Sequence, residues 1–127
     1  MICYEFEERF IEPILDGRKR ITLRKGDGAA VPRRGERVAL ISGARVIGIA
    51  TVHGARLVGI TIRDDGAAVP TVDGFCEEDE DVFARLDGFE DEWKMGEWYC
   101  RHYKIARGQT VAFVEIELGL EERRMPW

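Results

Sequence analysis

The sequence has few of the residues that cross-link small folds or hold metal ions. Its 127 residues include three widely separated cysteines, none in a Cys-x-x-Cys pair: Cys3, Cys76 and Cys100. Three cysteines at these spacings argue against a disulfide scaffold and against a zinc finger, and they are typical of a protein in a reducing compartment such as the cytoplasm. There are two histidines, His53 and His102, so a metal enzyme is poorly supplied. We therefore expect neither a metal ion nor a cofactor.

Long apolar runs are missing as well. No stretch approaches the roughly 20 apolar residues that a transmembrane helix needs, so we expect no membrane partner. The first ten residues, MICYEFEERF, contain neither a basic region nor an apolar region of the kind found in signal peptides. We therefore expect a cytoplasmic protein. A chain of this length is expected to fold as one domain with one core.

Charge is divided unevenly along the chain. Residues 1–60 carry 11 basic and 7 acidic side chains, whereas residues 61–127 carry 8 basic and 17 acidic ones. The net charge of −5 argues against bulk non-specific binding of nucleic acid, although a local basic surface is compatible with it. The two halves can face each other across a cleft or form two separately solvated faces. Charge alone favours the second arrangement.

Hydrophobic periodicity predicts helices and strands in a mixed order. Apolar residues at helical spacing predict a first helix that begins near Phe6, is interrupted at Pro13 and ends at Gly17. Two further helices are expected over 77–86 and 90–103. Strands are expected over 19–24, 37–42, 46–62 and 110–118, with a loop over 64–74 and a frayed tail over 121–127. This order predicts an α+β domain in which helices flank a curved, mostly antiparallel sheet or a small β-barrel.

The segment GRKRITLR, at residues 17–24, carries the most chemistry. Alternation along a strand places Arg20, Thr22 and Arg24 on one face of the sheet. Lys19 falls on the opposite face by strict alternation. The turn after the glycine, or a β-bulge, must therefore bring Lys19 and Thr22 together if they share a site.

This segment resembles the signature of the ASCH family, whose fold is similar to the PUA RNA-binding barrel. The family pattern is an apolar helix, then Gly-x-Lys-x-x-Thr-x-Arg and a loop. A Gly-Asp/Glu-x-Val-x-Leu strand follows, matched here by GERVAL at 35–40, and a later helix ends in an acidic-Gly-Phe triplet, matched by DGF at 87–89. The resemblance implies a single PUA-like ASCH domain over 1–127, with its core at about 6–118 and a tail at 119–127.

The resemblance also implies a function. It implies a cleft that binds RNA, a nucleotide or a modified nucleoside through the basic residues Arg18, Arg20, Arg24 and Lys25. One subgroup of small bacterial members hydrolyses the amide of N4-acetylcytidine, and another is reported to cut RNA. In the amidohydrolase subgroup the catalytic residues are the Lys and Thr of the motif and a Glu at the triplet. The corresponding positions here are Lys19, Thr22 and Asp87, so the third position holds the shorter acid.

The residues themselves allow this chemistry under stated conditions. Amide hydrolysis needs an activated nucleophile, a proton shuttle and stabilisation of the oxyanion. A threonine hydroxyl is inert until a base takes its proton, and a lysine serves as that base only if desolvation or nearby cations lower its pKa. The arginines beside Lys19 favour its neutral form. The alternative interpretation is a solvated basic turn next to an ordinary strand threonine.

Several other features leave alternatives open. A second triplet, Asp73-Gly74-Phe75, also offers a carboxylate, although only the triplet at 87–89 follows a helical pattern. Four aromatic residues lie at helical spacing: Trp93, Trp98, Tyr99 and Tyr103. They either pack in the hydrophobic core, which is the commoner role, or stack on a nucleobase.

Three classes of function follow from these features. We predict an RNA- or nucleoside-binding module first, an amidohydrolase or ribonuclease second, and a protein-interaction domain third. The deciding observation is whether Lys19, Thr22 and a carboxylate line one pocket. A pocket without the carboxylate favours binding alone.

Overall fold

A curved sheet of six strands forms the frame of the protein. The computed structural model describes residues 1–25, 31–72 and 79–125. The strands are β1 (Ile2–Glu5), β2 (Ile21–Lys25), β3 (Arg37–Ser42), β4 (Arg45–Ile62), β5 (Ala68–Thr71) and β6 (Thr110–Arg123). They are ordered β1-β3-β4-β6-β2, and β5 pairs with β4. β1 pairs in parallel with β3 and every other pairing is antiparallel. The described strands stay open rather than closing into a barrel, which confirms the α+β class with a curved sheet.

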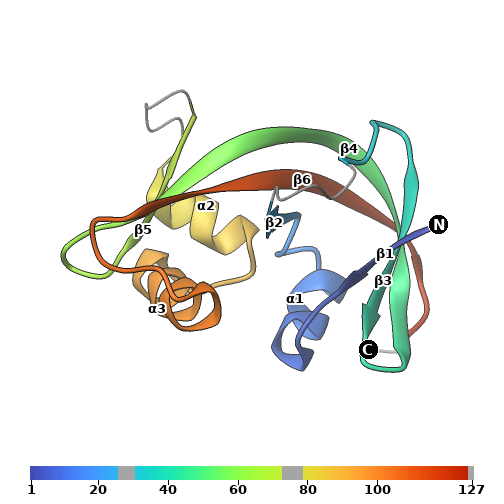
Figure 1. Ribbon diagram of the computed structural model, residues 1–127. Helices are drawn as coiled ribbons and strands as arrows, with labels where there is room; N and C mark the ends of the chain where they lie inside the picture. The colour runs from blue at the N-terminus through green and yellow to red at the C-terminus, as the bar shows by residue number, and fades with distance from the viewer. Residues whose placement is uncertain (26–30, 73–78, 126–127) are drawn as a thin grey trace.

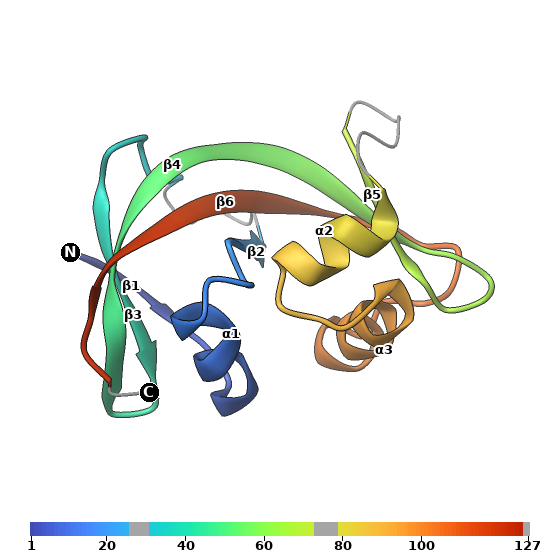
Figure 2. The same cartoon turned by 180° about the vertical axis from the view of Figure 1, so that it is seen from behind.

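The two long strands, β4 and β6, arch over the molecule, and the helices lie beneath them (Figure 1). The helices are the 3₁₀ turn η1 (Glu8–Phe10), α1 (Ile11–Leu15), α2 (Glu80–Leu86) and α3 (Glu92–Tyr103). Seen from behind, α1 lies on the side of the molecule where β1 and β3 lie, whereas α2 and α3 lie on the side of β5 (Figure 2). The register between β4 and β6 shifts at Ile49/Ala50 and at Val52/Gly54. Such bulges bend a sheet and increase its twist, so they account for part of the curvature.

The structure corrects several boundaries expected from the sequence. β1 precedes the expected core, and β5 lies inside the segment expected to be a loop over 64–74. β6 continues to Arg123, through part of the tail expected to fray. β1 and the end of β6 take strand conformation because they pair with strands distant in sequence, which local alternation does not reveal. β5 pairs instead with the end of β4, the strand that precedes it in the chain. The first helix is split into η1 and α1, and β2 begins at Ile21 rather than at residue 19. Residues 77 and 78 of the expected second helix lie outside the described residues.

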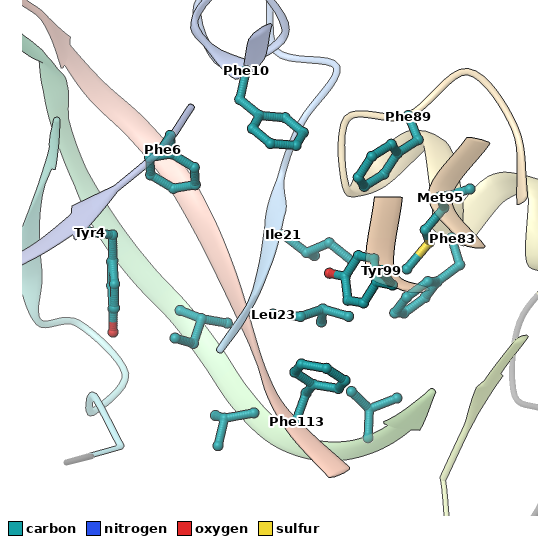
Figure 3. Packing of buried hydrophobic residues seen from close by; sticks show 14 of the residues in the cluster. Tyr4, Phe6, Phe10, Ile21, Leu23, Phe83, Phe89, Met95, Tyr99 and Phe113 are labelled. Atoms are coloured by element: carbon teal, nitrogen blue, oxygen red, sulfur yellow. The ribbon is translucent and has the colours of Figure 1, made fainter. Parts of the chain in front are cut away.

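Aromatic side chains connect the two helical regions beneath the sheet. The Phe10 ring, at the end of η1, packs edge-on against Phe89 at a centroid distance of 5.4 Å and against Trp98 of α3 at 5.7 Å. Tyr99 packs edge-on against Phe113 of β6 at 5.5 Å. Figure 3 shows these rings, except that of Trp98, gathered around the inner face of β2 and β6. Each such pair adds about 0.5–1.5 kcal/mol beyond area burial, so the helices hold a defined position relative to the sheet.

Three glycines fix the backbone around this core. Gly17 and Gly88 follow α1 and α2 in the left-handed region, with φ values of +84° and +92°, which side chains rarely adopt. Gly96 in α3 lies so close to the preceding loop that an added Cβ would overlap the carbonyl oxygen of Gly66. α3 therefore sits against backbone, with no space for a side chain at position 96. Among the described residues, no helix combines the length and apolarity that a bilayer crossing requires.

Candidate functional site

A buried ion pair joins the start of β2 to the end of α2. The Nζ of Lys19 donates hydrogen bonds of 2.7 Å to the Oδ1 and to the backbone carbonyl oxygen of Asp87. The side chains of Lys19 and Asp87 are 5% and 3% exposed. The two residues are brought together by backbone, because the N–H of Arg20 donates to the carbonyl oxygen of Leu86 at 2.8 Å. Burial lowers the pKa of Lys19, and the attraction of Asp87 opposes that shift.

Tyr99 of α3 completes this network. Its hydroxyl donates a 2.7 Å hydrogen bond to the Oδ2 of Asp87, so both carboxylate oxygens are engaged. Burial raises the pKa of Tyr99 well above its usual 10.0, and the Asp87 charge adds to the rise, so the hydroxyl remains a donor. The sequence places Tyr99 among core or base-stacking aromatics and gives no sign of this contact. The available signal is general: a buried tyrosine hydroxyl needs an acceptor.

A small cavity of about 80 Å³ brings the three predicted catalytic positions together, since Lys19, Thr22 and Asp87 all line it. Thr22 is buried in β2, and its Oγ1 accepts a 3.2 Å hydrogen bond from the Nε of Arg24. Lys19 shares the cavity with Thr22 because it precedes the strand, so strand alternation does not apply to it. Another hollow in the described part of the protein, between α1, α2 and α3, is larger, at about 820 Å³.

The four predicted ligand-binding residues separate into two groups. Arg24 lines the cavity, and its guanidinium donates to the carbonyl oxygen of Glu5 at 2.9 Å. Burial lowers the pKa of Arg24. The other three lie outside the cavity on exposed surface. Arg18 pairs with Asp16 at 2.6 Å, Arg20 donates to a backbone carbonyl, and the Lys25 ammonium lies 5.9 Å from the centroid of an aromatic ring.

Aromatic side chains of α3 form another wall of the cavity. Trp98, His102 and Tyr103 all line it. The Trp98 Nε1 donates a 2.6 Å hydrogen bond to Glu7, and the His102 ring stacks on the indole at 4.3 Å with an interplanar angle of 10°. A flat stack of this kind offers a face on which a planar heterocycle can continue. Trp93, the fourth predicted aromatic, is 48% exposed and does not line the cavity.

The remaining candidates contribute little to this site. The triplet at 73–75 and Cys76 lie outside the described residues. Cys3 and Cys100 are free thiols that do not line the cavity. Within the part of the chain that the structure describes, no three His, Cys, Asp or Glu side chains are grouped to hold a metal ion.

The buried pair is not explained by a contribution to stability alone. Removing two charges from water costs several kcal/mol per ion, roughly, and well-packed apolar side chains often serve a core as well or better. A lysine with a lowered pKa, next to a cavity, is typical of functional sites. The arrangement can hold a proton between Lys19 and a group in the cavity, with Asp87 and Tyr99 fixing the position of the ammonium.

Comparison with known proteins relates this chain to others through its fold. No family model matches the sequence, and no curated protein matches it. A solved structure of the protein EF3133 from Enterococcus faecalis, described under the family model DUF984, is similar with a TM-score of 0.64 and 13% identity. The match covers 97% of this chain and 77% of that one. A mutant of ZmASCH from Zymomonas mobilis is similar with a TM-score of 0.55 and 13% identity, covering 96% of this chain and 70% of the other. The chain therefore has an ASCH-like fold.

Proposed function

We propose that this ASCH-like domain hydrolyses an acyl amide on a nucleobase, as in N4-acetylcytidine. The observation that carries the proposal is the small cavity shared by the Lys19–Asp87 pair and Thr22. The sequence favours binding alone if the carboxylate is absent from such a pocket, and here the carboxylate is present. The shorter Asp87 is in direct contact with Lys19, so its length is no obstacle to the pairing.

The size of the cavity limits what enters it. The cavity has a volume of about 80 Å³. Typical pockets for whole ligands are larger, at about 300–1,000 Å³. An acetyl group fits this space, whereas a complete nucleoside does not. We place the acyl group beside Lys19 and the base outside, against the stacked rings of Trp98 and His102.

We assign the roles from the cavity that these residues share and from the hydrogen bonds around it. Lys19, whose pKa is lowered by burial, takes the proton of the Thr22 hydroxyl. The threonine oxygen attacks the acyl carbon, the amide C–N bond breaks, and Lys19 returns the proton to the departing amine. Water then hydrolyses the threonine ester and releases the acid. Arg24, which already donates to the threonine oxygen, supplies positive charge near the oxyanion.

A panel of acylated nucleosides tests the proposal. We expect release of acetate from at least one of them, and a loss of at least about a hundredfold in kcat/KM in Lys19→Ala, as is typical when a general base is removed. Lys19→Arg does not rescue the rate, because a guanidinium stays protonated. A matched control is Arg45→Gln, which changes an exposed cation outside the cavity. Full activity in Lys19→Ala contradicts the assignment.

Binding without turnover is the second candidate, and one observation favours it. The ammonium of Lys19 donates to two oxygens of Asp87, which favours the charged form that cannot act as a base. In that case calorimetry detects nucleoside or short-RNA binding that is weakened by Lys19→Ala, while no acylated nucleoside is deacylated. Strand breaks in end-labelled RNA, dependent on Lys19, indicate a ribonuclease instead.

A further inference from the structure

The guanidinium of Arg24 brings unused hydrogen-bond donors to the small cavity, which it lines. A guanidinium carries five N–H donors. The Nε of Arg24 donates to the Oγ1 of Thr22 at 3.2 Å, and its Nη2 donates to the carbonyl oxygen of Glu5 at 2.9 Å. Its remaining N–H groups have no acceptor among the described residues.

Lys19 and Thr22 add further donors to the same cavity. An ammonium carries three hydrogens, and Lys19 directs hydrogen bonds to the backbone carbonyl oxygen and the Oδ1 of Asp87. The Thr22 oxygen accepts from Arg24, whereas its own hydroxyl hydrogen has no acceptor within residues 1–25, 31–72 and 79–125. One wall of the cavity therefore offers hydrogens from three side chains to a ligand that accepts hydrogen bonds.

The buried carboxylate does not satisfy these donors. Both oxygens of Asp87 are engaged, Oδ1 by Lys19 and Oδ2 by Tyr99. With Lys19 protonated, the inner part of the cavity holds two cations, Lys19 and Arg24, and one anion, Asp87. Positive charge that is shielded from water favours an anion beside it. Glu5 and Glu7 also line the cavity, but both are exposed, so water screens their charges.

The guanidinium is held in an orientation that suits a planar anion. It lies over the rings of Tyr4 and Phe6, with distances of 5.1 and 4.8 Å from the guanidinium carbon to the ring centroids. Aromatic rings therefore cover the guanidinium, and its hydrogens lie in its plane, at the rim. A carboxylate receives hydrogen bonds from such a rim with both oxygens. The cavity volume of about 80 Å³ restricts the ligand to a short acid.

We propose that this cavity is a binding site for small carboxylates, of which acetate is the simplest probe. Arg24 and the Thr22 hydroxyl donate to the carboxylate oxygens, and the Lys19 ammonium lies beside them. Acetate binding itself depends only on these donors. Its consequence for turnover rests on the proposed function: hydrolysis of an acetyl amide produces acetate in this cavity. The acid leaves after the amine, so acetate competes with the substrate for the free enzyme.

The first test uses the parent protein, so no variant has to fold. Sodium acetate is titrated at constant ionic strength, with sodium chloride as the balancing salt, and saturation transfer from the protein to the acetate methyl protons is measured by NMR. We expect a saturable signal for acetate. Trimethylacetate carries the same charge on a bulkier body, and we expect no saturable signal from it. Equal binding of the two acids, or an acetate signal that does not saturate, overturns the proposal.

The second test removes the guanidinium. Arg24→Gln is expected to weaken acetate binding at least about tenfold, because hydrogen bonds to a charged group contribute about 1.5–3 kcal/mol. The matched control, Arg45→Gln, makes the same change in charge at an exposed site outside the cavity, and its acetate affinity stays parental. Equal affinities of the two variants contradict the assignment of Arg24.

The proposed function and this inference fail separately. Deacylation without saturable binding of acetate retains the hydrolase and overturns the carboxylate site. Saturable acetate binding that depends on Arg24, in a protein that deacylates none of the nucleosides, supports the carboxylate site and contradicts the hydrolase. Where both hold, acetate raises the KM for the acylated nucleoside and leaves kcat unchanged.

Discussion

Two of the ion pairs that link distant parts of the chain lie in different surroundings. Lys19 and Asp87 pair beneath the sheet with side chains 5% and 3% exposed. Arg56 and Glu115 pair across β4 and β6, where they are register partners, with side chains 36% and 11% exposed. The guanidinium donates two hydrogen bonds of 3.2 Å to the two carboxylate oxygens.

Comparing the two ion pairs separates the effect of charge attraction from the effect of shielding the charges from water. The Arg56–Glu115 pair is positioned by the sheet itself and its arginine remains accessible to water, so its contribution is small and favourable. The Lys19–Asp87 pair is almost completely shielded from water and depends on a third residue, Tyr99, to satisfy its carboxylate. Its location at a cavity, rather than its contribution to stability, is what distinguishes it. Substitutions in each pair test this distinction.

Breaking the buried pair has the largest expected effect. Lys19→Met alone leaves an unpaired buried carboxylate, and we expect the free energy of unfolding in urea to fall by about 3–5 kcal/mol. The triple variant Lys19→Met, Asp87→Leu, Tyr99→Phe removes every polar member of the network together. We expect it to recover most of that stability while deacylation stays absent. A triple variant no more stable than the single one contradicts this account of the pair.

Removing the third member has an intermediate effect. Tyr99→Phe leaves the Oδ2 of Asp87 without its donor in a buried position, which lowers the free energy of unfolding by about 1–3 kcal/mol. Because Asp87 then holds Lys19 less rigidly, kcat falls while KM for an acylated nucleoside changes little. The neighbouring Tyr103→Phe serves as a control, since its ring lines the cavity while the hydrogen bond to Asp87 comes from Tyr99. Equal effects of the two variants would argue against a positioning role for Tyr99.

A smaller expected effect is the change of stability with pH that Lys19 contributes. Burial lowers the pKa of Lys19 below its ordinary 10.5, so between those two values the unfolded chain holds a proton that the folded protein lacks. The unfolding free energy contributed by Lys19 therefore rises with pH across that window and is constant below it. Subtracting the pH profile of Lys19→Met from that of the parent isolates this rise. A flat difference between the two profiles contradicts the lowered pKa.

Changing the Arg56–Glu115 pair has the smallest expected effect. Arg56→Gln lowers the free energy of unfolding by about 1 kcal/mol or less, because the pair remains partly accessible to water. Deacylation remains parental, since Arg56 does not line the cavity. A destabilisation comparable to that of Lys19→Met would remove the distinction between the two pairs.

The sequence predicts much of the frame and only part of the site. Period-2 alternation locates β3, β4 and the start of β6, and glycine punctuation locates the ends of α1 and α2. β1 and β5 are missed because each is only four residues long, and β1 also depends on pairing with a strand distant in sequence. Lys19 and Asp87 are 68 residues apart, so only the resemblance to a known pattern relates them in advance.

Whether the short side chain of Asp87 reaches Lys19 depends on backbone geometry that sequence reasoning does not provide. Gly88 takes a positive φ and passes so close to Lys19 that a Cβ there would contact its side chain. This approach brings the backbone of residue 87 near enough for its carbonyl oxygen, as well as its carboxylate, to accept from the lysine. The larger hollow between α1, α2 and α3 is also missed by sequence reasoning, because the side chains that line it come from separate segments and form no run in the sequence.

The close contact between Gly96 and the carbonyl oxygen of Gly66 makes the position of Tyr99 depend on a glycine in α3. Position 96 lies one helical turn before Tyr99, so a bulkier residue there would push α3 away from the loop and carry the tyrosine off Asp87. A chain can therefore keep the lysine motif and the acidic-Gly-Phe triplet and still lack the assembled network. In this sequence the Gly-x-x-Tyr that supplies the contact begins nine residues after the acid of the triplet, so the assembled network requires both elements.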